Sequence, residues 1–332
     1  MSISFVIPTY NSQKYILKCL NSIYSSICYS FEVLIIDGGS IDNTLNLIME
    51  FDPKIKIFSN KYKTAEAGKL IGINNAKCDF ICLLDSDNEL EKNYIDIAIK
   101  ELSLNSSIMG AEPIKFSYRP SDGIIDRFSS IYGVNDPLNI YLGNFDKYSD
   151  FHKDWTKAKY SIINENSNYI TIKLFDKKII PTIGANGTIL RRKPLVDFIK
   201  NKDYFFDVDY IVHRINTKGE CLFIKVKKGI IHYYCVDDFR NFYKKQSRRI
   251  KDFYYFKDLR VPNKQKYTLE KIFFVLNVIF PIFMIYKSCK IFIKRKDVAS
   301  LLLFPLSIIT LYVYVIYSLK FLLFGNSSFK RN

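Results

Sequence analysis

The hydrophobic pattern of the first third of the chain alternates between two periods. Short, nearly continuous apolar runs predict buried strands, and longer stretches with apolar residues at helical spacing predict helices between them. The predicted strands cover residues 3–7, 31–36, 55–58 and 79–84, and the predicted helices cover 12–26, 42–51 and 65–76. Because strands that alternate with helices form sheets covered on both faces, we expect an α/β fold with a doubly wound, mainly parallel sheet.

The pattern weakens in the middle of the chain and returns later. Residues 105–180 are rich in Asn, Ser, Asp, Lys and Tyr, which fits either a substrate-facing insertion or long loops. Beyond them we expect a strand interrupted by glycines at 179–187, then a helix that ends near residue 217. Two further strands are expected near 221–226 and 229–234.

The C-terminal part has the pattern of membrane segments. Residues 298–319 hold 22 positions without a charge, enough to cross the roughly 30 Å hydrocarbon layer. An earlier apolar run is shorter and contains Pro281, so a span over about 272–293 requires lysines whose side chains reach the membrane surface. Two full spans would place the five basic residues of the intervening loop outside the cytoplasm, whereas an in-plane or re-entrant first segment would keep them inside. We expect two spans.

Charge divides the chain at the same place. Of 49 Lys+Arg and 33 Asp+Glu, residues 240–332 hold 19 and 4. We therefore expect a near-neutral domain over 1–239, a basic interfacial region over 240–271 and membrane segments over 272–324. Aromatic residues interleaved with the basic ones favour membrane lipids, and no nucleic-acid motif accompanies the charge. The apolar content excludes disordered and collagen-like classes, and the N-terminus reads as a strand, so we expect a cytoplasmic domain on a membrane-attached protein.

Carboxylates follow two of the predicted strands, where ligands of such sheets bind. Asp37 opens an Asp-Gly-Gly-Ser turn whose glycines allow close backbone approach, and its carboxylate can accept from a base or a ribose hydroxyl. Asp85 and Asp87 follow the next buried run, and two such carboxylates can hold Mg²⁺ or Mn²⁺ that bridges a diphosphate. Each motif alone is ordinary turn chemistry, so their order and strand context carry the prediction. No GxGxxG follows the first strand, which disfavours a redox dinucleotide domain.

Three segments together resemble the signature of glycosyltransferase family 2, over roughly residues 3–235. They are Val6-Ile7-Pro8-Thr9-Tyr10-Asn11, Asp37-Gly38-Gly39-Ser40-Ile41-Asp42-Asn43-Thr44 and Asp85-Ser86-Asp87. The resemblance implies the GT-A fold and a UDP- or GDP-linked sugar donor. It also implies roles for the nucleotide edge: Pro8, Tyr10 and Asn11 at the nucleotide, Asp37 at the base, Asp85 and Ser86 at the ribose or a metal-bound water, and Asp87 and Asp85 at the metal.

The resemblance further implies a basic residue and a base for the acceptor. Lys69 stands where the family often has a basic residue near the diphosphate, and a solvated helix lysine is the alternative. The family usually has a Glu-Asp pair before a helix, and here Asp207 matches the Asp while Phe206 replaces the Glu. Asp207 is therefore the candidate catalytic base. Asp209 is the substitute, and one of the two carboxylates fits a role at a helix N-terminus.

Other candidates lie later in the chain. Gly184 and Asn186 resemble part of the family's glycine-rich acceptor loop. His232 follows an apolar strand and fits a metal ligand, a phosphate contact or a buried structural histidine. Arg248 and Arg249 lie in a partial Gln-x-x-Arg-Trp motif whose Trp is Ile250, and we interpret them as contacts to lipid or acceptor phosphate.

The expected function is a membrane-bound, metal-dependent, inverting glycosyltransferase. Its acceptor would be lipid-linked, either a polyisoprenyl phosphate or a lipid-linked oligosaccharide. A catalytically silent, membrane-anchored module that binds nucleotide sugars or glycans stays open, as does a processive polysaccharide synthase, which Ile250 and the few membrane segments disfavour. A nucleotidyltransferase is disfavoured because no glycine-rich triphosphate loop is present. The sequence does not indicate which sugar or acceptor is used.

Overall fold

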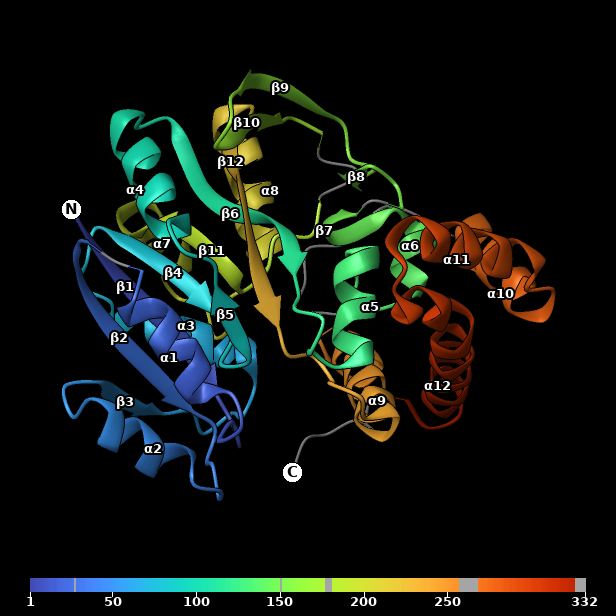
Figure 1. The fold of residues 1–332 in the computed structure, drawn as a ribbon. Helices are drawn as coiled ribbons and strands as arrows, with labels where there is room; N and C mark the ends of the chain where they lie inside the picture. The colour runs from blue at the N-terminus through green and yellow to red at the C-terminus, as the bar shows by residue number, and fades with distance from the viewer. Residues whose placement is uncertain (27, 150, 177–180, 257–267, 326–332) are drawn as a thin grey trace. The chain divides into compact units, whose positions relative to one another are not determined.

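The computed structural model describes all residues except 27, 150, 177–180, 257–267 and 326–332. The chain divides into two compact units (Figure 1). Unit 1 comprises Met1–Ser117 and Ala158–Tyr233, and unit 2 comprises Tyr118–Lys157 and Tyr234–Asn332. The middle region that the sequence pattern left open is therefore divided between the two units, and its central part groups with the C-terminal residues.

Unit 1 is built on one large mixed sheet. Its strands are β1 (Ser2–Thr9), β2 (Ser30–Asp37), β3 (Lys56–Ser59), β4 (Phe80–Leu84), β5 (Asn88–Leu90), β6 (Ile108–Ser117), β9 (Tyr160–Glu165), β10 (Tyr169–Leu174), β11 (Asn186–Arg191) and β12 (Cys221–His232). They lie in the order β3-β2-β1-β4-β11-β6-β12-β10-β9, and β5 pairs with β12. The helices of this unit are α1 (Ile16–Tyr24), α2 (Thr44–Phe51), α3 (Ala65–Asn75), α4 (Tyr94–Leu104), α7 (Arg192–Ile199) and α8 (Asp207–Lys218).

The first third of the chain folds as its hydrophobic pattern predicts. Strands β1 to β4 pair in parallel through β1–β2, β2–β3 and β1–β4, with the predicted helices between them. The later strands differ in detail. The predicted glycine-interrupted strand becomes β11, which starts at Asn186 and runs antiparallel to β4, while residues 177–180 lie outside the described residues. The two strands expected near 221–226 and 229–234 form the single strand β12, whose register shifts between Val226 and Gly229.

Alternating side chains of β1 face helices on opposite sides of the sheet, as the strand period requires. Phe5 and Ile7 are fully buried in a core that also holds residues of α1 and α4. On the other face, an added Cβ at Gly72 of α3 would lie 2.2 Å from the Val6 Cγ1 atom. Only glycine therefore allows α3 to pack this closely on β1.

Unit 2 combines the central region with the C-terminal helices. Its elements are α5 (Ile124–Tyr132), α6 (Leu138–Leu142), β7 (Asn144–Ser149), β8 (Asp154–Thr156), α9 (Phe239–Tyr255), α10 (Thr268–Ile279), α11 (Ile282–Arg295), the 3-10 helix η1 (Val298–Leu302) and α12 (Leu303–Phe324). Strands β7 and β8 form an antiparallel pair. One hydrophobic core joins Phe128 and Tyr132 of α5 to Phe242 of α9, Phe274 of α10 and Leu306 of α12. The shared core explains why residues 118–157 belong with the C-terminal part.

The apolar tail forms the helices that its sequence predicts. Among the described residues, one helix, Val298–Phe324, is long and apolar enough to cross a membrane, with a mean hydropathy of 2.2. The earlier segment is broken: α10 and α11 meet at 81°, and Pro281, which lacks a backbone N–H, is the N-cap of α11. This geometry fits a broken span or a re-entrant hairpin, so the expectation of two full spans stays a prediction. The basic segment before it forms α9, and residues 257–267 lie outside the described residues.

Candidate active site

The carboxyl ends of β1, β2 and β4 lie side by side at one edge of the unit 1 sheet. Thr9 pairs with Asp37 across β1 and β2, and Val6 pairs with Leu83 across β1 and β4. Because all three strands run in the same direction, their following loops emerge at the same edge. Fold topology therefore brings together the three motifs on which the family resemblance rests.

The first two loops are tied together by their own polar groups. The Asn11 N–H donates to the Ser40 Oγ atom at 2.9 Å, and the Asn11 Oδ1 atom accepts from the Ile41 N–H at 2.9 Å. The Asp37 carboxylate accepts from the N–H of Gly39 at 2.8 Å and from the N–H and Oγ of Ser40 at 2.9 and 2.6 Å. Gly39 has a φ of +88°, which favours glycine. Asp37 and Asn11 thus shape the edge loop in addition to any contact with a nucleotide.

Pro8 and Tyr10 lie beside this loop and differ in their packing and exposure. Pro8 lies under α3, where an added Cβ at Gly68 would come within 3.2 Å of the Pro8 Cβ atom. Tyr10 is 55% exposed although it is aromatic. An exposed ring beside a loop of backbone donors is suited to stack on a planar ligand.

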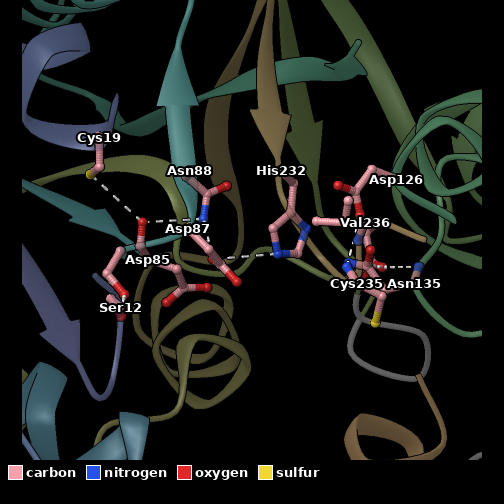
Figure 2. A network of polar contacts seen from close by, with 12 residues as sticks. Ser12, Cys19, Asp85, Asp87, Asn88, Asp126, Asn135, His232, Cys235 and Val236 are labelled. Atoms are coloured by element: carbon pink, nitrogen blue, oxygen red, sulfur yellow. Dashed lines mark hydrogen bonds and ion pairs between the residues drawn. The ribbon is translucent and has the colours of Figure 1, made fainter. Parts of the chain in front are cut away.

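Asp85, Asp87 and His232 form a polar cluster at the end of β4 (Figure 2). The His232 Nε2 atom lies 3.5 Å from the Asp87 Oδ1 atom. The Asp87 carbonyl accepts from the Tyr233 N–H at 2.9 Å, which fixes the end of β12 against this loop. The His232 ring also lies 5.6 Å from the Phe116 ring and is buried. His232 is therefore a buried histidine and, at the same time, a neighbour of the carboxylate pair.

The surroundings of Asp85 oppose its negative charge. Burial raises the pKa of Asp85 most, and the negative charge of Asp87 raises it further. The positive charges of Lys69 and His232 offset part of this effect, and the resulting pKa of Asp85 is about 6. The positive charge of a cation beside the two carboxylates would stabilise the ionised form of Asp85 and so lower this pKa.

Ser86 reaches the first loop through a contact that the sequence did not indicate. The Ser86 and Ser12 hydroxyl groups lie 2.7 Å apart, and both residues are buried. The Ser12 N–H in turn donates to the Thr44 Oγ1 atom at 2.8 Å. Ser12 follows the first motif directly, and only its position next to that motif could have pointed to it.

Lys69 and Asp207 form a nearly buried ion pair. The Lys69 Nζ atom lies 2.8 Å from the Asp207 Oδ2 atom, and their side chains are 10% and 13% exposed. Burial lowers the pKa of Lys69, but attraction to Asp207, Asp85 and Glu66 outweighs it, so the pKa lies above its ordinary value. Lys69 is thus not the solvated helix lysine that was the alternative.

The two carboxylate oxygens of Asp207 have different surroundings. Asp207 Oδ1 is buried and has no hydrogen-bond partner among the described residues. A buried carboxylate oxygen without a donor is energetically costly, so a hydroxyl group that donates to it would be favoured there. Asp209 lies in the same first turn of α8.

The predicted acceptor loop meets β4 through its backbone. The Asp85 N–H donates to the Ala185 carbonyl at 2.9 Å, between Gly184 and Asn186. An added Cβ at Gly184 would contact nothing within 4 Å, so this position borders open space. The Asn186 Oδ1 atom is buried and lacks a hydrogen-bond partner among the described residues. Gly184 and Asn186 therefore adjoin the carboxylate cluster of unit 1.

Arg248 and Arg249 belong to unit 2 and differ from each other. Arg248 is exposed on α9. The Arg249 Nη1 atom lies 3.4 Å from the Asp136 Oδ2 atom, which also accepts from the Tyr314 hydroxyl of α12. Despite burial, the attraction of Tyr234, Asp136 and other acidic groups raises the pKa of Arg249 above its ordinary value. Arg249 therefore ties α9 to α12, whereas Arg248 has the exposure expected of a phosphate contact.

The cluster of Asp85, Asp87 and His232 provides only part of the ligand set of a metal ion. Among the described residues, no group of three or more His, Cys, Asp or Glu side chains is arranged to hold a metal ion. Asp85 and Asp87 nevertheless lie together, and burial together with the negative charge of Asp87 raises the pKa of Asp85. Mg²⁺ is typically held by one or two carboxylates, with phosphate oxygens and water as further ligands. Asp85 and Asp87 therefore fit a divalent ion that binds together with a diphosphate.

Known proteins resemble this chain over parts of its length. The family model described as Glycosyl transferase family 2 matches residues 4–121. An uncharacterized glycosyltransferase of Rickettsia conorii is 36% identical over 108 residues, which are 32% of this chain and 18% of that protein. A dolichyl N-acetyl-alpha-D-glucosaminyl phosphate 3-beta-D-2,3-diacetamido-2,3-dideoxy-beta-D-glucuronosyltransferase of Methanococcus voltae is 28% identical over 216 residues, 63% of this chain and 61% of that protein. The match spans less than two thirds of either relative.

Two solved structures resemble the fold. The structure of S. aureus TarS in complex with UDP matches with a TM-score of 0.46 and 20% identity, over 74% of this chain and 64% of that one. The mannosyltransferase PcManGT from Pyrobaculum calidifontis, in complex with GDP-Man and Mn²⁺, matches with a TM-score of 0.47 and 13% identity, over 98% and 79%. The predicted GT-A type of α/β fold, with a mixed and partly parallel sheet, is confirmed. The resemblance to glycosyl transferase family 2 that the motifs indicated is therefore confirmed over residues 4–121.

Proposed function

We propose that the protein is a membrane-attached, inverting glycosyltransferase that moves a sugar from a UDP- or GDP-linked donor to a lipid-linked acceptor. The observation that carries the proposal is the arrangement at one sheet edge of unit 1. Asp85 and Asp87 lie beside the loops of the first two motifs, and the Lys69–Asp207 pair interacts electrostatically with Asp85. Residues suited to the donor, the metal ion and the acceptor reaction thus lie close together in unit 1.

The donor would bind along the loops after β1, β2 and β4. Tyr10 would stack on the base, and the Asp37 carboxylate would accept a hydrogen bond from the base in addition to those from its own loop. Asp85 and Asp87 would hold Mg²⁺ or Mn²⁺ together with the donor diphosphate, and the ion would supply charge neutralisation for the leaving group. Lys69 carries a charge stabilised by its acidic neighbours, so it is suited to attract the same diphosphate.

Asp207 would act on the acceptor. In an inverting displacement the acceptor oxygen forms a bond to the anomeric carbon while the bond to the diphosphate oxygen breaks. A sugar hydroxyl must lose its proton in this step, and the Oδ1 atom of Asp207 is available to take it because Oδ2 binds Lys69. Asp209 is the alternative base. A polyisoprenyl phosphate is already ionised and needs no base.

Unit 2 supports the proposed acceptor class and location. The basic helix α9, the bent α10–α11 pair and the apolar helix that ends in α12 support attachment to a membrane with the catalytic domain in the cytoplasm. The name of the Methanococcus voltae relative includes a dolichyl phosphate-linked sugar, which agrees with a lipid-linked acceptor.

Donor turnover tests the proposal. The full chain is purified in detergent and supplied with UDP- and GDP-sugars and Mg²⁺ or Mn²⁺, and release of nucleoside diphosphate is measured. We expect metal-dependent release from one donor, and its loss in Asp87→Ala but not in Asp197→Ala, which removes an exposed carboxylate that forms an ion pair with the exposed Lys200. If neither turnover nor metal-dependent donor binding occurs with lipid extract present, the silent binding module becomes the better explanation.

The acceptor is tested with the same protein. With a sugar-hydroxyl acceptor, Asp207→Asn should lower the rate by 100-fold or more, in line with the roughly 10²–10⁴-fold contribution of a general base. With a polyisoprenyl phosphate acceptor, substantial activity should remain. If Asp209→Asn alone removes the hydroxyl reaction, the assignment of the base to Asp207 is wrong.

A further inference from the structure

Unit 2 contains a cavity that the proposed donor site does not use. The cavity has a volume of about 590 Å³ and is lined by α6, by the turn between β7 and β8, and by α10 and α11. Most of its wall is apolar or aromatic, with Tyr141, Phe151, Phe273, Phe283 and Met284 as the larger contributors. A cavity of this size and composition is suited to a hydrocarbon chain.

Two lysines border the apolar wall. The Lys157 Nζ atom donates to the Tyr141 carbonyl at 3.2 Å, and its side chain lies against Gly143, where an added Cβ would come within 2.1 Å of it. The Lys287 Nζ atom lies 5.6 Å from the Phe151 ring centroid and 5.3 Å from that of Phe283. Neither lysine forms an ion pair with any residue that the structure describes. Glu270 is the acidic residue that lines the same cavity.

His152 lies in the wall with these lysines. Burial lowers its pKa most, and the charges of Lys157 and Lys287 lower it further, to about 4. The ring packs between Phe145 and Phe151, at centroid distances of 4.2 and 4.4 Å. Its Nε2 atom is buried and has no hydrogen-bond partner in the described part of the chain. Two cations and an imidazole nitrogen with no partner therefore share one end of an apolar cavity, which favours an anion there.

The outer surface of the helices that line the cavity is apolar as well. Large apolar side chains of α10 and α11 that do not line the cavity are exposed as well: Ile279 at 59%, Ile282 at 80%, Ile285 at 47%, Tyr286 at 60% and Ile293 at 74%. Exposed apolar side chains in this number are typical of a segment that lies in a membrane. The helices that line the cavity thus also carry exposed apolar side chains that are suited to contact lipid.

We propose that this cavity binds the lipid phosphate of the acceptor, with the hydrocarbon chain along the aromatic wall and the phosphate between Lys157 and Lys287, within reach of His152. The inference rests on the proposed lipid-linked acceptor and adds its binding site. The phosphate would supply an anionic partner for the ammonium groups of both lysines. The hydrocarbon chain would remove the apolar wall of the cavity from contact with water. Lys157 and Lys287 would then select a lipid that bears a phosphate monoester or diphosphate over one that bears a zwitterionic headgroup.

The single tryptophan of the chain offers a direct probe. Trp155 is buried in β8, two positions before Lys157. The full chain in detergent micelles is titrated with phosphatidic acid that carries brominated acyl chains, and quenching of Trp155 fluorescence is followed. Brominated phosphatidylcholine is the comparison lipid. No donor or metal is present, so a failure of the transferase reaction leaves this result unaffected, and donor turnover measured separately tests only the proposed function.

We expect half-maximal quenching at a lower concentration of phosphatidic acid than of phosphatidylcholine. The double variant Lys157→Gln/Lys287→Gln should raise that concentration by about 10-fold or more, because both charged donors to the phosphate are removed. Lys290→Gln is the matched control, since Lys290 lies one turn further along α11, is exposed and does not line the cavity. Circular dichroism verifies that each variant is folded.

A second variant tests the apolar part of the site. Leu276→Phe, at a cavity-lining position of α10, should weaken quenching by the lipid phosphate as well. The proposal is overturned if the two brominated lipids quench equally in wild type, or if the folded double lysine variant matches wild type. It is also overturned if inorganic phosphate alone displaces the lipid and Leu276→Phe has no effect, because the site would then bind an anion without a chain.

Discussion

At the scale of single residues, Asp85 is held where its charge is disfavoured. Burial and the neighbouring Asp87 raise its pKa from the ordinary value near 4 to about 6. The folded protein therefore binds this proton more tightly than the unfolded chain does. The corresponding contribution to the free energy of unfolding is fully present below pH 4 and is lost as the pH rises through about 6.

This shift predicts a conflict between stability and activity at position 85. Without divalent ions, Asp85→Asn should raise the free energy of unfolding at neutral pH by about 1–2 kcal/mol, because the disfavoured charge is absent, while donor turnover should be lost. The difference from wild type should shrink as the pH falls from 7 to 4. Thermal unfolding of both proteins across this range measures it. An Asp85→Asn protein that is less stable than wild type at pH 7 would contradict the prediction.

The Lys69–Asp207 pair leads to a second residue-scale prediction. Asp207→Asn leaves a nearly buried ammonium group without its partner, which should lower the free energy of unfolding by about 2–3 kcal/mol. The double variant Lys69→Met/Asp207→Asn should recover most of that loss because no unpaired charge remains. Chemical denaturation of the two single variants and the double variant measures the coupling. Additive losses in the double variant would show that the pair contributes little.

Some of these residues could be predicted from sequence and others could not. Asp37 ends one nearly continuous apolar run, and Asp85 and Asp87 follow another, so their place at the sheet edge follows from the parallel topology. The pairing of Lys69 with Asp207 joins residues 138 positions apart in the sequence. Local pattern holds no information on such a contact, and the family resemblance suggested the two residues separately.

At the scale of elements, hydrophobic period predicts best where strands are buried on both faces. The edge strand β3 is mostly exposed, but strands β1, β2 and β4 have this pattern over most of their length. Strand β12 does not, because Lys225 lies inside the sheet, 1% exposed, and pairs with the buried Glu112 of β6. A lysine in a strand predicts a position that faces solvent. The register of β6 and β12 places Glu112 beside Lys225, and this partner makes the burial of Lys225 tolerable.

Close packing of α3 on β1 gives a prediction at this scale. Gly72→Ala should lower the free energy of unfolding by about 1–2 kcal/mol, because the clash with Val6 and Ile36 exceeds the gain in helix propensity of roughly 1 kcal/mol. Gly184→Ala is the matched control, since its added methyl group meets open space. Thermal unfolding compares the two. Equal effects at both positions would mean that α3 shifts without cost.

At the scale of the whole molecule, the sequence pattern did not reveal the two compact units. Composition and charge predicted a boundary near residue 239, but residues 118–157 lie far from the tail in sequence and share a core with it. Short apolar runs such as that of α6 are too brief to show a period. Their partners are the tail helices, so the sequence of the insertion alone could not indicate its role.

The tail carries the last prediction, that the full chain is held in membranes by its apolar helix rather than by charge. After expression in bacterial cells, wild-type protein should stay in the membrane pellet through washes with high salt and with alkaline carbonate. Arginines at the half-exposed Ile308 and Val315 of α12 should release it, because each costs roughly 2.5–3.5 kcal/mol near the centre of a span. Met49→Arg, on an exposed position of α2 in unit 1, is the control and should leave retention unchanged. Release of the wild-type protein by salt alone would instead assign attachment to the basic face of α9, since salt screens headgroup contacts but leaves a buried apolar helix in place.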